Sequence, residues 1–448
     1  MADWSHDFLT LESPDSLLKS FGRKRFNAGL LPADYPIHNW YRFVLAYPPE
    51  IVDRYTKLFA LPEGATVLDP FCGTGTTLIQ SRLNGMKAIG VEANPVAAFA
   101  SNVKLDWSVD PKLLLAHAHE IADVAERKIA DSGFVDSKHC KSQPPSGHLR
   151  TVADDKLAVL ITNSISPLPL HKALILLELI DATKEKQIHG HLRLVFAKCL
   201  VFSYSNLRFG PEVGLGKVKV DTPVVGPWLQ EIERVAADIC ALRRKSYPEA
   251  SVIEGDARQI GNLIEPGSVD AVITSPPYPN EKDYTRTTRL ESVILGFVNN
   301  KAELRLMKKG LLRSNTRGAY KEDEDDLWVS TNDKIDSIAT EIERRRLKLG
   351  KTSGFEKLYA RVTKLYFGGM TRHFAELRRA LRPGAKLAYV VGDQASYLQV
   401  MIKTGELLGE IASELGYQVD GIDLYRMRAA TATRSSLREE VIRLSWKG

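Results

Sequence analysis

Two short motifs contain the residues of this sequence that are best suited to chemistry. The first, DPFCGTGTT, runs from Asp69 to Thr77, and the second, TSPPY, runs from Thr274 to Tyr278. Glycines in the first motif would let a ligand approach the backbone, and the free N–H groups of a following helix would face that ligand. Prolines in the second would fix hydrogen-bond acceptors in place before a substrate arrives. These features suggest a nucleotide-type cofactor held beside a preorganised acceptor pair.

The first motif is flanked by segments that predict a strand, a tight turn and a helix. The apolar run 65–68 predicts the strand, and the residues from Thr76 onward predict the helix. A second buried strand is predicted over 88–91. It ends in Glu92, about 20 residues beyond the glycine turn, which is the spacing at which an acid meets a ribose in dinucleotide-binding folds.

Further strands are predicted over 251–254 and 269–274. The first is followed by Asp256, and the second leads directly into Ser275. The carboxyl ends of parallel strands meet at one edge of a sheet, and open α/β sheets bind their ligands at that edge. We therefore expect both motifs and the strand-end acids to share one crevice.

The two motifs resemble those of S-adenosylmethionine-dependent amino-methyltransferases. Their cofactor pattern Phe-x-Gly-x-Gly is matched by Phe71, Gly73 and Gly75, and their catalytic tetrapeptide (Asp/Asn/Ser)-Pro-Pro-(Tyr/Phe/Trp) is matched by 275–278. Either motif alone could be a turn of an unrelated α/β protein, but both in one chain favour the family. The resemblance implies a Rossmann-like class I methyltransferase sheet, S-adenosyl-L-methionine as cofactor and double-stranded DNA as substrate.

The resemblance also implies roles for individual residues. It places Glu92 at the ribose hydroxyls of the cofactor and Asp256 at the adenine amino group. The segment from Asn39 to Glu50 either packs over the methionine end of the cofactor or is an ordinary amphipathic helix. The expected cofactor-binding residues are Asp69, Phe71, Cys72, Gly73, Thr74, Gly75, Thr76, Glu92, Asp256 and Ala257, and the expected catalytic residues are Ser275, Pro276, Pro277 and Tyr278.

The expected reaction is the methylation of an exocyclic amine, whose lone pair is delocalised into the ring of the base. In the family-like arrangement, Ser275 and the Pro276 carbonyl accept hydrogen bonds from the amino group and turn its lone pair toward the methyl group. Tyr278 stacks on the flipped base, a contact worth about 1–3 kcal/mol, which offsets part of the unstacking cost. Methylation of cytosine C5 is disfavoured because it needs a cysteine nucleophile, and Cys72 lies inside the cofactor turn.

Several assignments of the substrate remain open. Serine at position 275 favours N4 of cytosine over N6 of adenine by resemblance alone, because most adenine enzymes have Asp there. The phrase DPFCGTG also resembles tRNA guanine-N2 methyltransferases, although only 68 residues precede it here. A non-catalytic nucleic-acid-binding module is the alternative from a different class. The sequence contains no recognisable nuclease site, so any restriction endonuclease partner would be a separate chain.

The length of 448 residues exceeds one ordinary domain and predicts a catalytic domain with two mainly helical insertions. Helices are predicted over 113–129, 173–180 and 192–202, a linker over 142–147, and a closing antiparallel strand over 440–446. The expected divisions are 1–105 (N-terminal segment and first half of the catalytic domain), 106–250 (first insertion), 251–300 (catalytic motif), 301–355 (charged insertion) and 356–448 (C-terminal part).

The first insertion is the leading candidate for target recognition, and the second is the runner-up. Segment 205–219 of the first insertion could contact phosphates or could be a glycine-rich connector. The residues after Tyr278 could line the base pocket or form a solvated loop. The expected DNA-binding residues are Arg208, Phe209, Lys217, Lys219, Lys282, Tyr284 and Arg286.

Composition limits the remaining classes of function. A net charge of +6 permits a polyanionic partner without requiring one. The four cysteines lack Cys-x-x-Cys spacing, and the pairs His117/His119 and His189/His191 are poorly placed for shared coordination, so no metal is expected. The sequence has no signal-peptide pattern and no long apolar run, so we expect a cytoplasmic protein without a membrane segment.

Overall fold

The computed structural model describes residues 36–42, 46–137, 148–210, 213–243, 245–280, 282–429 and 436–448. Its centre is a seven-stranded sheet in the order β5-β2-β1-β6-β7-β9-β8. The pairs β1–β2, β1–β6, β2–β5 and β6–β7 are parallel, whereas β9 runs antiparallel to β7 and β8. The strands are β1 (Thr66–Asp69), β2 (Lys87–Glu92), β5 (Ala250–Glu254), β6 (Val269–Thr274), β7 (Leu381–Gly392), β8 (Gln418–Ala429) and β9 (Ser436–Ser445).

This sheet confirms the predicted Rossmann-like fold with its antiparallel strand. The strand expected over 440–446 is part of β9, which lies between β7 and β8 and not at the edge of the sheet. Each strand predicted beside the motifs is present within a residue or two of the expected bounds.

Helices cover both faces of the sheet because successive strand residues point to opposite sides. On one face, α2 (Glu50–Leu58) packs against Val67 and Ile273, and α3 (Thr76–Leu83) lies beside it. On the other face, α14 (Tyr359–Leu377) packs over Leu68 and Val272, and α15 (Thr404–Glu414) packs against β7, β8 and β9. Neighbouring residues of one strand thus belong to different hydrophobic clusters.

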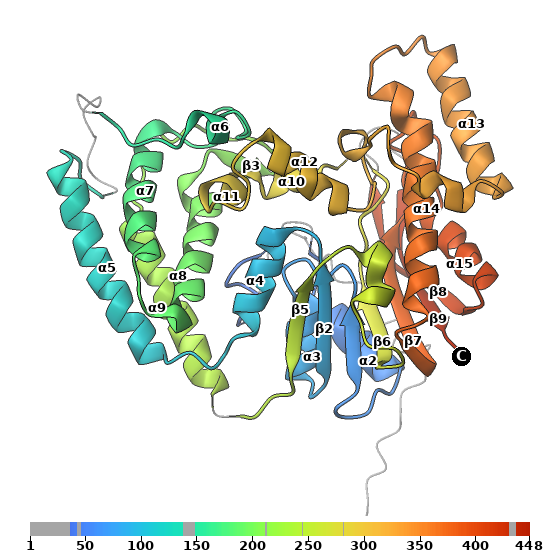
Figure 1. The fold of residues 1–448 in the computed structure, drawn as a ribbon, viewed down its shortest axis with the longest axis horizontal. Helices are drawn as coiled ribbons and strands as arrows, with labels where there is room; N and C mark the ends of the chain where they lie inside the picture. Colours follow the sequence, from blue (N-terminus) through green and yellow to red (C-terminus); the bar gives the residue numbers. More distant parts are fainter. Residues whose placement is uncertain are drawn as a thin grey trace, which may run out of the picture.

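The first insertion, which follows α4 (Pro95–Leu105) and precedes β5 in the chain, forms a helical block beside the sheet (Figure 1). The expected helices lie within this block, and the linker 142–147 lies outside the described residues. Helix α9 (Val225–Leu242) was not predicted. Buried Lys172 forms ion pairs of 3.2 Å with Asp136 and 2.6 Å with Asp221. The block contains α5 (Pro111–Asp131), α6 (Asp154–Leu157), α7 (Pro167–Asp181), α8 (Lys186–Cys199), a π-helical turn (Leu200–Tyr204), the hairpin of β3 (Leu207–Phe209) and β4 (Val213–Leu215), and α9 (Val225–Leu242).

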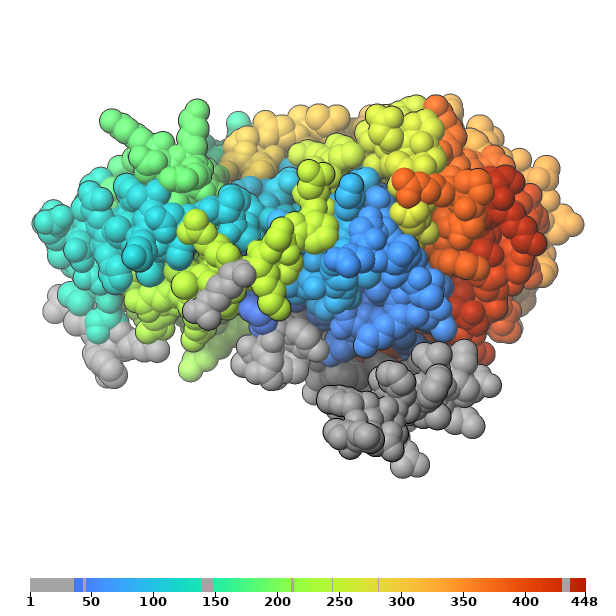
Figure 2. Space-filling view, turned by 90° about the horizontal axis from the view of Figure 1, so that it is seen from below, coloured from blue at the N-terminus to red at the C-terminus, as the bar shows by residue number. Residues whose placement is uncertain are grey.

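The elements after β6 extend above the carboxyl edge of the sheet toward the opposite end of the molecule (Figure 1). They are α10 (Tyr284–Thr287), α11 (Arg289–Ile294), α12 (Lys301–Gly310), α13 (Asp333–Lys348) and the 3₁₀ turns Thr316–Gly318, Asp325–Val329 and Glu356–Leu358; a further 3₁₀ helix, Ala257–Asn262, follows β5. Seen from below in Figure 2, the helical block, the first strands and the C-terminal elements follow one another along the longest axis. The crevice between them holds the candidate site.

Candidate active site

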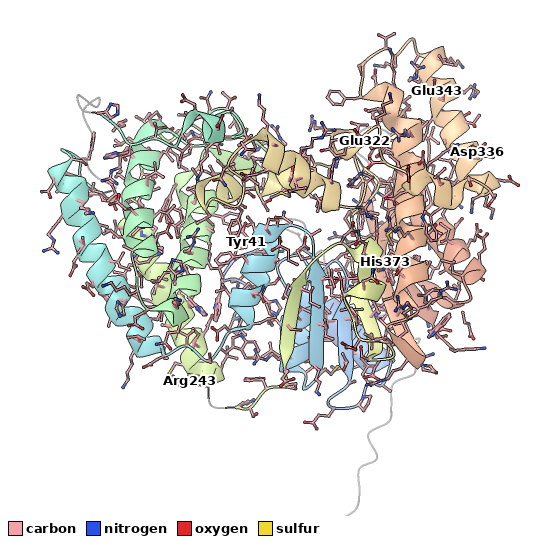
Figure 3. All side chains as sticks on the ribbon, in the orientation of Figure 1. Tyr41, Arg243, Glu322, Asp336, Glu343 and His373 are labelled. Atoms are coloured by element: carbon pink, nitrogen blue, oxygen red, sulfur yellow. The ribbon has the colours of Figure 1, made fainter. Side chains whose placement is uncertain are left out.

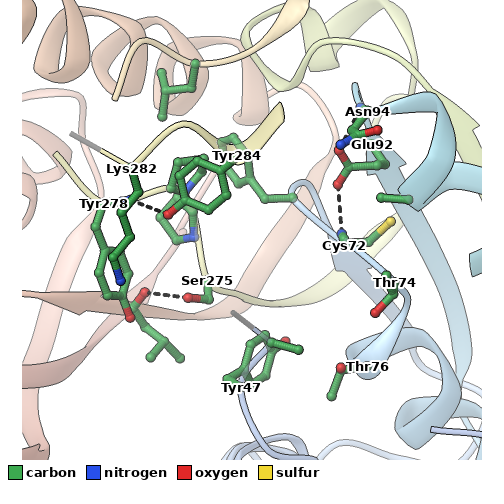
Figure 4. A pocket seen from close by; sticks show the side chains of 18 of the residues that line it. Tyr47, Cys72, Thr74, Thr76, Glu92, Asn94, Ser275, Tyr278, Lys282 and Tyr284 are labelled. Carbon is green, nitrogen blue, oxygen red and sulfur yellow. Dashed lines mark hydrogen bonds between the residues drawn. The ribbon is translucent and has the colours of Figure 1, made fainter. Parts of the chain in front are cut away.

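Residues of both motifs line a cavity of about 470 Å³ at the carboxyl edge of the sheet. This volume lies within the range of small-molecule sites. In Figure 4, the side chains of the glycine loop lie on one side of the cavity and those of the Ser-Pro-Pro-Tyr motif lie on the other. Of the expected residues, the lining includes Phe71, Cys72, Gly73, Thr74, Thr76, Glu92, Asp256, Ala257 and all four residues 275–278.

The glycine loop turns sharply because Gly73 and Gly75 adopt φ values of 54° and 83°, which side chains disfavour. A Cβ atom on Gly73 would meet no protein atom within 4 Å, so the backbone here is open to a ligand. A Cβ atom on Gly75 would lie 3.0 Å from Ser101 Oγ. Gly75 was expected to contact the cofactor, but it does not line the cavity. In the structure it shapes the turn.

Asp69 is buried behind the loop and also does not line the cavity. Its carboxylate accepts hydrogen bonds from Thr274 Oγ1 at 2.6 Å, from the Phe71 N–H at 3.1 Å and from the Thr77 hydroxyl. Burial raises the pKa of this carboxyl group to about 6. Asp69 therefore joins β1 to β6 and to the start of α3. We expected a direct contact with the cofactor, but in the structure Asp69 supports the glycine loop from the side away from the cavity.

Glu92 lies beside the loop at the end of β2 and lines the cavity. Its carboxylate accepts hydrogen bonds from the backbone N–H groups of Gly73, at 2.8 Å, and Asn94, at 2.7 Å. Burial raises its pKa to about 7. A carboxylate can accept more bonds than these two, so the site has the acceptor that a ribose requires.

Asp256 and Ala257 form the next part of the wall, and both are held by residues that the sequence analysis did not name. Both carboxylate oxygens of Asp256 accept bonds from Arg258, with Nε at 3.0 Å from each and Nη2 at 2.7 Å from Oδ2. The Ala257 carbonyl lies 2.9 Å from His373 Nδ1.

His373 is a buried residue of α14, and its ring contacts Tyr389 of β7. A carbonyl can only accept, so the proton must lie on Nδ1, and Nε2 accepts from the Tyr389 hydroxyl at 2.7 Å. Burial lowers the pKa of His373 to about 4, which keeps the ring neutral. The ring packs edge-on against Phe71, with centroids 5.1 Å apart. His373 thus positions two parts of the cavity wall.

Ser275 and Tyr278 face the cavity from the end of β6 (Figure 4). The Ser275 hydroxyl donates its only proton to the Val390 carbonyl at 3.2 Å, so the oxygen is left as an acceptor. The Tyr278 hydroxyl donates to Glu439 at 3.0 Å, and the Tyr278 N–H donates to the Tyr284 hydroxyl at 3.2 Å. Arg428 lies 5.7 Å from the Tyr278 ring centroid. Glu439 and Arg428, which lie far along the chain, were not predicted.

The segment before α2 also reaches the cavity, through Tyr47 and Pro48. In its described part no helix precedes Glu50, and residues 43–45 of the segment lie outside the described residues. Lys104 is buried and donates to the carbonyls of Tyr41, at 3.1 Å, and Thr74, at 2.8 Å. Burial lowers its pKa to about 7. Lys104 thereby connects this segment to the glycine loop.

The expected DNA-binding residues fall into two groups. Phe209, Lys282 and Tyr284 line the cavity, whereas Arg208, Lys217, Lys219 and Arg286 do not. Lys219 donates to the Ser203 carbonyl at 2.7 Å. Arg208, Lys217 and Arg286 make no side-chain hydrogen bond or ion pair within the described residues.

In the part of the chain that the structure describes, no cluster of histidine, cysteine and acidic side chains is suited to a metal ion. Likewise, no helix in the described part of the chain has the length and apolar character needed to cross a bilayer.

The sheet order and the glycine loop opposite Ser-Pro-Pro-Tyr define a Rossmann-like methyltransferase domain. A family model described as a DNA methylase, N6_N4_Mtase, matches residues 32–101. The chain is 27% identical over 431 residues to the Type II methyltransferase M.BsoBI of Geobacillus stearothermophilus, covering 89% of this chain and 82% of the relative. It is 24% identical to the Type II methyltransferase M.AvaI of a Nostoc species, covering 86% and 80%. Together these findings support an S-adenosylmethionine-dependent DNA amino-methyltransferase, with S-adenosylmethionine as the methyl donor.

Proposed function

We propose that the protein transfers a methyl group from S-adenosylmethionine to N4 of a cytosine flipped out of duplex DNA, within a restriction–modification system. The matched family model, described as a DNA methylase, supports DNA over tRNA as the substrate, and the names of the two relatives, both Type II methyltransferases, support that setting. The observation that carries the proposal is the Ser275 hydroxyl. Its proton is used by the Val390 carbonyl, so its oxygen is ready to accept a hydrogen bond from an amino group at the cavity.

The proposed cofactor position follows from the chemistry of the cavity wall. The Gly73 backbone would lie against the methionine portion, Glu92 would accept from the ribose hydroxyls, and Asp256 would accept from the adenine amino group. The open backbone at Gly73 and the partly used carboxylate of Glu92 fit such a ligand. When bound, S-adenosylmethionine supplies a methyl group on a positively charged sulfur.

The proposed mechanism is a direct transfer without an enzyme-bound intermediate. Ser275 and the Pro276 carbonyl accept hydrogen bonds from the amino group, which makes its nitrogen lone pair available. With the cofactor bound, the nitrogen would accept the methyl group as the C–S bond broke to leave S-adenosylhomocysteine, and its surplus proton would pass to solvent. Tyr278, held by Glu439 and Tyr284, supports the base from the side. The protein contributes orientation and preorganised acceptors.

The hairpin β3–β4 of the first insertion is the proposed contact with the DNA backbone. Phe209 lines the cavity, and the exposed side chains Arg208 and Lys217 are not used in other contacts of the described residues. In the second insertion, Arg305 pairs with Glu322, Lys308 with Asp283 and Arg313 with Asp323, whereas the exposed Lys301, Lys309, Arg317 and Lys321 form no ion pair among the described residues and are a second set that could meet phosphates. Unpaired cations are the ones available to phosphates.

Cofactor affinity should depend on the ionisation of Glu92. Its pKa is raised from 4.5 to about 7, so the carboxylate that would accept the ribose bonds is lost as the pH falls through that value. If only the ionised form binds well, affinity measured by calorimetry should fall about tenfold between roughly pH 8 and roughly pH 6.

Asp69 and Lys104 also titrate in this range, so the wild type alone does not identify the group. Glu92→Gln should bind the cofactor weakly and with little dependence on pH. A Gln variant that keeps the tenfold change would remove Glu92 from the explanation.

The product of the reaction tests the proposed base. Duplex DNA and bulk tRNA should be incubated side by side with labelled S-adenosylmethionine, digested to nucleosides and separated. We expect label in N4-methylcytosine from DNA. N6-methyladenine would overturn the base assignment while keeping the mechanism, since the same acceptors can hold either amino group. Label in tRNA alone would overturn the substrate, and label at cytosine C5 would contradict the mechanism.

A further inference from the structure

Arg258 links the adenine end of the proposed cofactor site to the second insertion. It follows β5 in the 3₁₀ helix Ala257–Asn262 and is only 6% exposed. Beyond its bonds to both oxygens of Asp256, its Nη1 donates to Asp325 Oδ2 at 2.5 Å and its Nη2 donates to the Lys309 carbonyl at 3.0 Å. One guanidinium thus connects β5 to two parts of the second insertion.

The segment that Arg258 holds is itself a wall of the cavity. Gly310, Leu311 and Leu312, which directly follow the bonded carbonyl of Lys309, line the cavity. Arg313 fixes the same turn, because it donates to the carbonyls of Lys308, at 2.9 Å, and Lys309, at 3.2 Å, and pairs with Asp323. The end of α12 is therefore held in place by two buried arginines.

Helix α14 is shaped to let this segment approach closely. A Cβ atom on Gly368 would lie 1.8 Å from the Asp325 carbonyl oxygen, and one on Gly369 would lie 2.5 Å from Leu312 Cδ1. Any side chain at either position would push the Asp325 turn and Leu312 away from Arg258. Two adjacent glycines thus permit the contact between the insertion and the cavity wall.

Helix α13 of the second insertion is poorly suited to DNA phosphates. Figure 3 shows Asp336 and Glu343 on α13, at the outer margin of the molecule. The arginines of that helix pair with its own acids, Arg344 and Arg345 with Glu341, and Arg346 with Glu343. The strongest structural connection of this insertion is therefore inward, to the cavity.

We propose that the second insertion serves cofactor selection: through Asp325 it fixes Arg258, which positions Asp256 to recognise the amino group of the adenine ring. The inference rests on the proposed cofactor position. Arg258 and Asp325 do not line the cavity, so both act through Asp256 as positioning residues. A remote change at Asp325 should then alter discrimination between an adenine and a closely related base.

The test compares S-adenosylhomocysteine with S-inosylhomocysteine, in which an oxo group replaces the adenine amino group. Calorimetry on the full chain should show that the wild type prefers the adenosyl ligand by about tenfold or more, since a site built around a hydrogen bond rejects a ligand lacking it. Arg258→Gln should reduce adenosyl affinity by about tenfold and abolish the preference. Asp325→Asn, which keeps the size of the side chain, should reduce the preference at least about threefold.

The neighbouring Asp326→Asn is the matched control, because Asp326 is paired only loosely with Arg361, at 3.8 Å. It should keep the full preference, and duplex DNA binding by the Arg258→Gln and Asp325→Asn proteins should remain near the wild-type level. If both variants lose affinity for the two ligands equally and keep the preference, Arg258 has only a structural role and the inference is wrong. Failure of the wild type to bind either ligand would instead overturn the proposed function.

Discussion

Ser275→Ala should lower turnover on duplex DNA about a hundredfold while cofactor affinity stays within about twofold of the wild type. The variant removes one of the two proposed acceptors for the amino group, and loss of one preorganised hydrogen-bonding group commonly costs about 10²–10³ in rate. The Ser275 hydroxyl donates to the Val390 carbonyl at 3.2 Å, which leaves its oxygen available as an acceptor. Single-turnover methylation and calorimetry on the same preparation measure the two quantities.

Ser268→Ala is the matched control for this prediction. Ser268 lies on the exposed turn before β6, where its hydroxyl donates to the Glu265 carbonyl at 2.6 Å. The control should methylate DNA at the wild-type rate. If Ser275→Ala did so too, the amino group would have to be held by another acceptor, and the proposed role of Ser275 would be lost.

Gly73→Val should abolish measurable cofactor binding, which means a loss of affinity of at least about a hundredfold. Gly73 has a φ of 54°, and a Cβ atom there would meet no protein atom within 4 Å, in space that the cofactor would fill. A β-branched residue is strongly disfavoured in this backbone conformation, so both the turn and the ligand space would be disturbed. Calorimetry with S-adenosylhomocysteine measures the loss.

Gly64→Val separates backbone strain from blocked ligand space. Gly64 has a φ of 77° and equally open surroundings, but it lies on the exposed turn before β1 and does not line the cavity. This variant should lose stability in thermal unfolding yet bind the cofactor normally when folded. Normal binding by folded Gly73→Val would show that the cofactor lies elsewhere.

Much of the fold was predictable because its signals are local. The strands that carry the motifs are short apolar runs, and each ends in a residue whose type marks the carboxyl edge, such as Asp69 or Glu92. The Ser-Pro-Pro-Tyr motif follows its strand without a gap, so its position in the sheet could be predicted with it. Helices such as α5 and α7 were predictable from apolar residues at helical spacing, although both helices are longer than predicted.

The residues that support the site were missed because their partners lie far away in sequence. Tyr278 and Glu439 are 161 positions apart, Ala257 and His373 are 116 apart, and Arg258 and Asp325 are 67 apart. A single sequence contains no signal for such pairings, since each missed residue, Arg258, Asp325, His373 or Glu439, is on its own an ordinary charged or aromatic side chain. The roles of Asp69 and Gly75 were likewise unclear, because spacing alone does not separate a residue that touches a ligand from one that braces the loop behind it.

The centre of the sheet can form only late during synthesis on the ribosome. β1 pairs with β6 through Val67↔Ala271 and Leu68↔Val272, so the whole helical block must be translated between the two strands. The helices of that block contact one another, and local contacts form faster than distant ones. The nascent chain therefore folds its first insertion while β1 still lacks its partner β6 and β2 lacks its partner β5. During that interval the apolar faces of these strands are open to chaperones and to aggregation, and the exposure of the face that carries Leu68 ends only when α14 emerges.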